Sequence, residues 1–320
     1  MINIMCVGFS VTGFGEPSYP ILLKDKIKKK HGNDCNVEYS SVGGLSVNAL
    51  PFLAHDLCPK TGYDILFLEI ATSWISLHFD DEELAFSCIN SSLSFFQKCA
   101  KKIVFLNLYR RDILDDDMVV RAIRRFEKIG YDVIDLKAHY RLKLQVHHTD
   151  DTTDGVHPTS VAIDHISECL YDYISIVQYA DHPKSITNEN FAIYLPQELS
   201  FDLIKFDNRH GVVVNACVIS LGQNITLFFD EPKYINGVFF IWGPDTAAMD
   251  LSINDFIMKV PMYDNMSYYR RIGYHSFPKT LVNRISLSLN PDRSGVVLQR
   301  EPWESVSEIK CYIIGFSLCY

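Results

Sequence analysis

Three side chains of the sequence, Ser10, Asp154 and His157, are of the types that together carry out acyl transfer. A serine hydroxyl is a weak nucleophile until a base takes its proton, and the base needs a carboxylate that holds its tautomer and stabilises the imidazolium. Asp154 and His157 are separated by two residues, one of them a glycine, and Pro158 follows, so a tight turn can present both side chains. The pattern predicts Ser10 as nucleophile, His157 as base and Asp154 as the partner of the base.

Acyl transfer also needs donors for the negative charge that develops on the carbonyl oxygen, and backbone N–H groups can supply them. Ser10 follows Gly8 and Phe9 at a predicted turn from strand to helix, where backbone N–H groups are free to bind an oxyanion. Gly44 lies in a Gly-Gly pair after the second predicted strand, and a glycine lets the backbone approach a reacting carbonyl closely. Backbone N–H groups beside Ser10 and in the Gly-Gly pair are therefore candidate oxyanion donors.

The chain up to about residue 180 alternates short apolar runs with amphipathic stretches whose apolar residues recur every three or four positions. The predicted strands are Ile2–Val7, Asn36–Ser40, Ile65–Glu69, Ile103–Leu108 and Tyr131–Ile134. The predicted helices are Tyr19–Lys30, Val47–Leu57, Asp81–Lys98, Asp116–Lys128 and a last one from Pro158 to about Gln178. This alternation predicts an α/β domain with a parallel sheet and helices on both faces, and ligands bind such sheets at the carboxyl ends of the strands.

After about residue 185 the helical periodicity ends and short runs rich in Val, Ile, Phe and Tyr take over. Predicted strands there are Val212–Leu221, Ile225–Phe229, Val238–Trp242, Phe256–Val260, Ile285–Leu289 and Lys310–Leu318. The pattern predicts a C-terminal antiparallel β-sandwich or jelly roll. The expected division is a catalytic domain at 1–180, a linker at 181–190 and a β-rich accessory domain at 191–320 that binds carbohydrate.

The order of the motifs resembles that of the SGNH (GDSL-like) hydrolase family. A serine ends the first strand, Gly-Gly follows the second, and Asp-x-x-His-Pro precedes the last helix. The resemblance covers about residues 1–178 and implies a flavodoxin-like three-layer α/β/α fold. It also implies the chemistry of esterases, lipases, carbohydrate acetylesterases or O-acetyltransferases.

On this resemblance Ser10 matches the nucleophile and first oxyanion donor, Gly44 the second donor, and Asp154 and His157 the rest of the triad. The block that usually reads Gly-x-Asn-Asp is here part of Leu68–Trp74, and Ser73 stands where the oxyanion-hole asparagine is expected. Loss of one such donor typically costs about 100- to 1000-fold in rate. The missing asparagine therefore leaves open a catalytically decayed fold that serves as a glycan-binding or scaffold protein.

Further substrate contacts are expected from Arg110, which follows the fourth strand, and from Tyr268 and Arg270 in the β-rich part. The alternative for Arg110 is a salt bridge to Asp112 or to the Asp115–Asp117 run at the start of a helix. Aromatic side chains of that part either form a sugar-stacking platform or belong to its core. His147 and His148 have no further ligands at helical spacing, so no metal site is expected.

Composition limits the classes of partner and the compartment. The net charge of −9 and the sequence pI of about 5.6 argue against a nucleic-acid binder. No signal peptide and no run of about 18 apolar residues is seen, so a cytoplasmic protein without membrane insertion is expected. The nine cysteines include no CxxC pair and are expected to be buried free thiols. The sequence gives no indication of the oligomeric state.

The sequence thus predicts a serine enzyme that hydrolyses or transfers an acetyl ester on a carbohydrate hydroxyl, in bacterial surface-polysaccharide metabolism. No tightly bound cofactor is expected, and acetyl-CoA would be the acyl donor of a transferase. A thioesterase or lipase acting on longer acyl chains is the remaining alternative.

Overall fold

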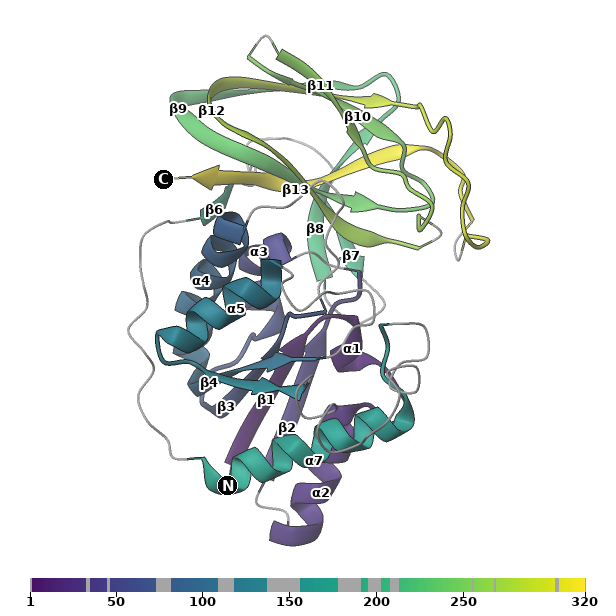
Figure 1. The fold of residues 1–320 in the computed structure, drawn as a ribbon. Helices are drawn as coiled ribbons and strands as arrows, with labels where there is room; N and C mark the ends of the chain where they lie inside the picture. The colour runs from purple at the N-terminus through teal and green to yellow at the C-terminus, as the bar shows by residue number, and fades with distance from the viewer. Residues whose placement is uncertain are drawn as a thin grey trace. The chain divides into compact units, whose positions relative to one another are not determined.

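The computed structural model describes residues 2–32, 35–44, 47–72, 82–108, 118–136, 156–177, 191–194, 203–207, 213–254, 256–267, 269–302 and 305–319. The chain forms two compact units, Met1–Thr187 and Asn188–Tyr320 (Figure 1). The predicted linker at 181–190 lies outside the described residues.

The first unit is built on a parallel five-stranded sheet with the order β2-β1-β3-β4-β5. Its strands are β1 (Ile2–Gly8), β2 (Cys35–Ser41), β3 (Tyr63–Glu69), β4 (Ala100–Asn107) and β5 (Asp132–Asp135). Its described helices are α1 (Ser10–Gly13), α2 (Tyr19–His31), the 3-10 helix η1 (Val47–Ala49), α3 (Leu50–Leu57), α4 (Glu82–Cys99), α5 (Met118–Lys128) and α7 (Ser160–Ile176). The predicted parallel sheet is confirmed.

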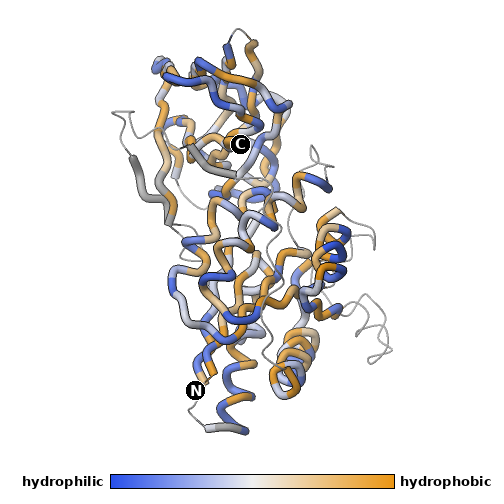
Figure 2. Tube along the Cα trace, turned by 90° about the vertical axis from the view of Figure 1, so that its left-hand side faces the viewer, coloured by the Kyte–Doolittle hydropathy of each residue, from blue (hydrophilic) through white to orange (hydrophobic). Residues whose placement is uncertain are grey.

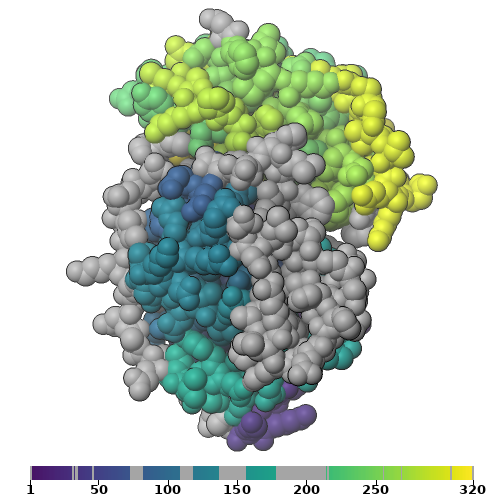
Figure 3. All heavy atoms as spheres, viewed as in Figure 1, coloured from purple at the N-terminus to yellow at the C-terminus, as the bar shows by residue number. Residues whose placement is uncertain are grey.

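Helices cover both faces of this sheet, as the alternating pattern predicts (Figure 1). On one face α2 and α7 pack on β1 to β4 through a single buried cluster that includes Leu23, Phe67 and Ile166. On the other face the Phe126 ring of α5 stacks on Phe105 of β4, with 5.4 Å between ring centroids. Side chains of α4 and α5 form part of the surface in Figure 3 (blue and teal).

The burial of β3 shows why the apolar runs form the middle of the sheet. Six of its seven residues are buried, as expected for a parallel strand covered on both faces. The helices have one apolar face only, and the alternation of polar and apolar residues can be followed in Figure 2. In α7, for example, Ala162, Ile163, Ile166 and Leu170 are buried, at spacings of three and four, while Val161 is exposed.

The second unit is antiparallel throughout its described pairs. Its strands are β6 (Phe191–Tyr194), β7 (Leu203–Asp207), β8 (Val213–Ser220), β9 (Asn224–Trp242), β10 (Ala248–Ile253), β11 (Phe256–Pro261), β12 (Arg271–Asn290) and β13 (Lys310–Cys319). The order is β11-β10-β12-β9-β13-β8-β7, with β6 also paired to β13. The long strands β9 and β12 pair with register shifts and enclose one apolar core to which β8, β10 and β13 also contribute.

The sequence prediction of a C-terminal antiparallel β domain is confirmed, but the bounds of one strand are wrong. Ile225–Phe229 and Val238–Trp242, which were predicted as separate strands, are parts of the single strand β9. Strands β6, β7 and β10 lie outside the predicted runs. The eight cysteines that the structure describes in full are buried and free, as predicted. Within the described residues, no helix is long and apolar enough to cross a membrane.

Truncation of Phe126 tests the packing of the first unit. Its ring is fully buried and contacts Phe86, Phe105 and Tyr131. We expect Phe126→Ala to lower the free energy of unfolding by about 3–5 kcal/mol, through lost burial and the cavity left behind. Urea unfolding followed by circular dichroism at a helix band reports on this unit, because every described helix lies in it. Arg124→Ala, at an exposed position of the same helix, should change the value by less than about 0.5 kcal/mol.

Candidate active site

Ser10 is the first residue of α1 and lies two residues beyond the end of β1. Phe9 precedes it, is almost fully buried, and anchors the turn through both its N–H and its carbonyl group. The Phe9 N–H donates to Oε2 of Glu69 at 3.3 Å, and the Phe9 carbonyl accepts from Thr12 N at 3.2 Å. These two hydrogen bonds fix the turn at the carboxyl edge of the sheet. Ser10, the next residue on this turn, is only partly buried.

The segment after β2 is tied to the same place. Ser41, the last residue of β2, pairs with Gly8, and the next residue, Val42, donates its N–H to the Gly8 carbonyl at 3.1 Å. Gly44 follows with φ of +70°, in the left-handed region that favours glycine. Gly44, the predicted second oxyanion donor, is thus only two residues after Val42, which is hydrogen-bonded to the strand that leads to Ser10.

His157 lies against the helix that Ser10 begins. Its imidazole stacks on the ring of Phe14, with centroids 4.3 Å apart and an interplanar angle of 27°. Phe14 directly follows α1, so the predicted base contacts a residue four positions after the predicted nucleophile. Gly15, the next residue, allows this segment to lie close to α7, because a Cβ there would be 2.4 Å from Cδ1 of Ile163 in α7.

The start of α7 fixes the backbone behind His157. Thr159 is the N-cap, and its hydroxyl accepts from Ala162 N at 3.3 Å. The helix runs from Ser160 to Ile176, two residues shorter at each end than predicted. At its start Pro158 and Thr159 precede the first turn, and at its end Val177 is the C-cap. The structure therefore brings together the elements that carry Ser10, Gly44 and His157.

Four predicted site residues, Asp154, Ser73, Arg110 and Tyr268, lie outside the described residues. Their roles as triad member, oxyanion donor and substrate contacts stay predictions. Among the described residues no group of three or more His, Cys, Asp or Glu side chains is arranged to hold a metal ion.

Glu69, the last residue of β3, is a polar residue of this edge to which the sequence analysis gave no role. It is fully buried and lies directly below the turn that bears Ser10. Burial raises the pKa of its carboxyl group, while hydrogen bonds from Thr72, Phe9 and Thr12 act in the opposite direction. The available signal was an acidic residue directly after the apolar run Ile65–Leu68.

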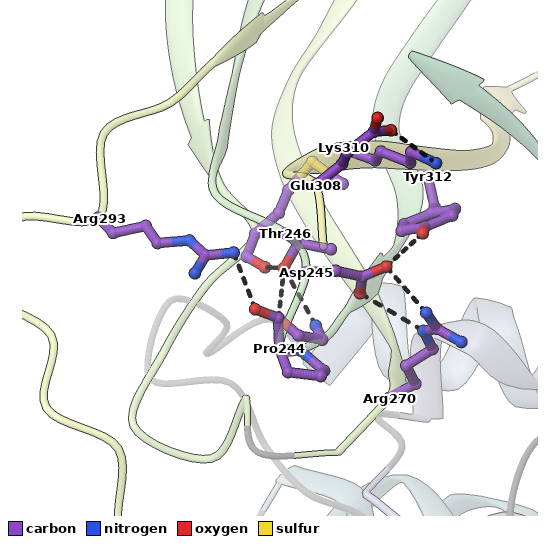
Figure 4. Close-up of polar contacts among 10 residues, drawn as sticks. Pro244, Asp245, Thr246, Arg270, Arg293, Glu308, Lys310 and Tyr312 are labelled. Atoms are coloured by element: carbon purple, nitrogen blue, oxygen red, sulfur yellow. Dashed lines mark hydrogen bonds and ion pairs between the residues drawn. The ribbon is translucent and has the colours of Figure 1, made fainter. Parts of the chain in front are cut away.

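The third predicted substrate contact, Arg270, belongs to a polar cluster of the second unit (Figure 4). Its guanidinium donates to both carboxyl oxygens of Asp245, at 2.8 and 3.4 Å, and lies 5.6 Å from the ring centroid of Tyr312. The Tyr312 hydroxyl donates to the same carboxyl group. Arg270 therefore has a structural role in joining three chain segments, and its predicted contact with substrate stays a prediction.

The loops around this cluster are held together by hydrogen bonds. Arg293 donates to the Pro244 carbonyl at 2.8 Å, and Lys310 N donates to the Asp245 carbonyl at 2.8 Å. Lys310 also forms an ion pair with Glu308 (Figure 4). The loop at 243–247 thus meets Arg293 and Lys310 at one end of the β domain, where the Arg270 side chain is one quarter exposed.

Comparison with known proteins shows the class of fold. No protein-family model matches the sequence, and no curated protein is similar to it. The structure is similar to those of a two-domain esterase (CEX) active on acetylated mannans. One matches with a TM-score of 0.69 and 11% identity over 99% of this chain and 91% of the other.

The same esterase co-crystallised with mannopentaose matches with a TM-score of 0.68 and 10% identity, over 99% and 90% of the two chains. Axe2, an acetylxylan esterase from Geobacillus stearothermophilus, covers 55% of this chain at 14% identity with a TM-score of 0.46. The likeness to the two-domain esterase extends over both units. The chain accordingly has a two-domain fold like that of this esterase, with a parallel α/β domain followed by an antiparallel β domain, as the sequence predicted.

Replacement of Phe14 tests the placement of His157. We expect Phe14→Leu to shift the imidazole proton resonances of His157, because the ring current of the stacked phenyl group is lost. Phe95→Leu is the matched control, since Phe95 contacts the imidazole of His55 with centroids 5.7 Å apart. Histidine NMR spectra should show that each variant moves one of the two signals and leaves the other in place. Movement of both signals by either variant would contradict the two separate contacts.

Proposed function

We propose that this chain is a serine esterase that removes an acetyl group from a carbohydrate hydroxyl through a Ser10–His157–Asp154 triad. The observation that carries the proposal is the contact between His157 and Phe14 beside α1, since it brings two residues far apart in the sequence to one edge of the sheet. The likeness to a two-domain esterase active on acetylated mannans supports the choice of an acetylated glycan as substrate.

In this proposal the Ser10 hydroxyl attacks the acetyl carbonyl while His157 takes its proton. The N–H groups of Ser10 and Gly44 bind the oxyanion, with a third donor from Ser73. The intermediate collapses to an acetyl-serine, and His157 returns the proton to the departing sugar oxygen. Attack of an acceptor on the acetyl-serine regenerates Ser10 and completes the reaction.

The acceptor decides between hydrolysis and transfer. Water gives acetate, whereas a sugar hydroxyl gives an O-acetylated glycan, for which acetyl-CoA would be the donor. Both reactions use the same triad and the same acyl-enzyme. No tightly bound cofactor takes part in either scheme.

The β domain is proposed to contribute glycan contacts through the end that carries Arg270. Trp242 and Tyr269 contact Arg271 there, with its guanidinium 5.5 and 5.4 Å from their ring centroids. Trp242 and Tyr269 are only partly buried, so these aromatic residues keep accessible surface at that end of the domain. Partly exposed aromatic rings are suited to stacking on the apolar faces of sugar rings.

Replacement of Ser10 tests the proposed chemistry. We expect Ser10→Ala to lower kcat for acetyl-ester hydrolysis by at least about 10⁴-fold, because the nucleophile is lost. It should also abolish labelling by a fluorophosphonate probe. The control is Ser94→Ala on α4, where an exposed serine donates to the Ser91 carbonyl one helical turn earlier. Labelling of a serine other than Ser10, with activity retained in Ser10→Ala, would rule the triad out.

Three assays of the wild-type protein distinguish the remaining candidate activities. We compare its rates on acetylated manno-oligosaccharides, on p-nitrophenyl esters of increasing acyl length, and on acetyl-CoA with a glycan acceptor. We expect hydrolysis to fall as the acyl chain lengthens, in contrast to a lipase or thioesterase. A chain that binds the oligosaccharide but shows neither labelling nor turnover would instead be a decayed, glycan-binding member of this fold.

A further inference from the structure

The side chain of Glu69 occupies the space beneath the turn that leads to Ser10. In the parallel register Gly8 of β1 pairs with Glu69 of β3, so both strands end at the same level. A Cβ on Gly8 would lie 2.8 Å from Cβ and from the carbonyl oxygen of Glu69, and 2.0 Å from Oγ1 of Thr12. The absence of a side chain at Gly8 therefore lets Glu69 and Thr12 meet below Ser10.

The two carboxyl oxygens of Glu69 hold two different loops. Oε2 accepts from Phe9 N at 3.3 Å and from the Thr12 hydroxyl at 3.4 Å, both in the turn that bears Ser10. Oε1 accepts from Thr72 N at 3.1 Å and from the Thr72 hydroxyl at 2.6 Å, in the segment after β3. One side chain thus links the nucleophile turn to the segment that leads directly into Ser73.

The buried position of Glu69 is unfavourable for a carboxyl group that only fills space. Glu69 is 0% exposed, and burial of a carboxyl group is unfavourable unless hydrogen bonds replace water. Thr12, one of the donors to Glu69, is itself hydrogen-bonded to Tyr19, whose buried hydroxyl lies 3.0 Å from the Thr12 hydroxyl. Among the described residues, the four hydrogen bonds to Glu69 come from these two loops, which indicates that the side chain fixes their positions.

We infer that Glu69 is a positioning residue of the acyl-transfer site, which fixes the Ser10 turn and the segment after β3 relative to each other. The inference rests on the proposed function, because it assigns Glu69 to the oxyanion geometry of that site. Glu69 is too deeply buried to touch substrate. It acts by binding the Phe9 N–H and the Thr12 hydroxyl, on either side of Ser10 in the sequence. The peptide that carries the Ser10 N–H lies between them, and the Phe9 carbonyl of that peptide accepts from Thr12 N.

Glu69→Gln tests this role. The amide is of similar size, but its NH₂ group donates where the carboxyl oxygen accepted, so the N–H of either Phe9 or Thr72 loses its acceptor. We expect kcat for acetyl-ester hydrolysis to fall about 100-fold, as a displacement of about 1 Å can cause, with KM changed less than about threefold. Asp64→Asn is the matched control at the opposite end of β3, where the carboxyl group accepts from Asn3 N at 2.8 Å and pairs with Lys101. It should leave kcat unchanged.

A second pair of variants separates the hydroxyl from its side-chain volume. Thr72→Ser keeps the donor to Glu69, whereas Thr72→Val removes it at nearly constant volume. Thr72→Ser should retain more of kcat than Thr72→Val does. Equal losses in the two variants would count against the hydrogen bond as the cause.

Amide hydrogen exchange provides a readout that does not depend on turnover. In Glu69→Gln the amide of Phe9 or Thr72 should exchange faster, while the interior amides of β3 keep their wild-type rates. Faster exchange throughout the sheet would show general destabilisation and overturn the inference, as would unchanged kcat and exchange. If wild-type protein neither reacts with the probe at Ser10 nor hydrolyses acetyl esters, the proposed function fails and this role fails with it. An active wild type with an equally active Glu69→Gln variant overturns the role of Glu69 alone.

Discussion

The pairing of Gly8 with Ser41 on one side and with Glu69 on the other is the constraint on which the candidate active site depends. Because the three strands are parallel and end at the same level, the loops that follow them leave the sheet at one place. The hydrogen bonds from Val42 to Gly8 and from Phe9 to Glu69 continue this register into the loops themselves. The position of Ser10 is therefore set by the backbone pairing of the sheet.

Much of the first unit was predictable, because its two kinds of element leave different patterns. The inner strands β1, β3 and β4 contain apolar runs buried on both faces, and the helices have apolar residues at intervals of three and four. Boundaries differed where local chemistry intervened. The stretch predicted as one helix from Val47 to Leu57 begins as a 3-10 turn, and Pro51 lies at the start of the α-helix that follows.

The second unit was harder to predict, because sheet pairing overrides local sequence. Asp230, Glu231 and Pro232 interrupt the apolar alternation and indicate a turn, yet β9 runs through them as one strand beside β12. In the site, the spacing of motifs identified Ser10, Gly44 and His157, which the structure places at one edge or beside α1. The stacking of His157 on Phe14 and the contacts of Glu69 join residues far apart in the sequence, so no local pattern contains them.

The central place of β13 has a consequence for how the β domain is made. This strand follows all the others along the chain, yet it pairs with β9 on one side and with β8 and β6 on the other. During synthesis the sheet edges of β8 and β9 that pair with β13 stay unpaired until Lys310–Cys319 has left the ribosome. The order of the strands thus delays completion of the domain, and the unpaired edges of the nascent chain must be protected from pairing with other chains until then.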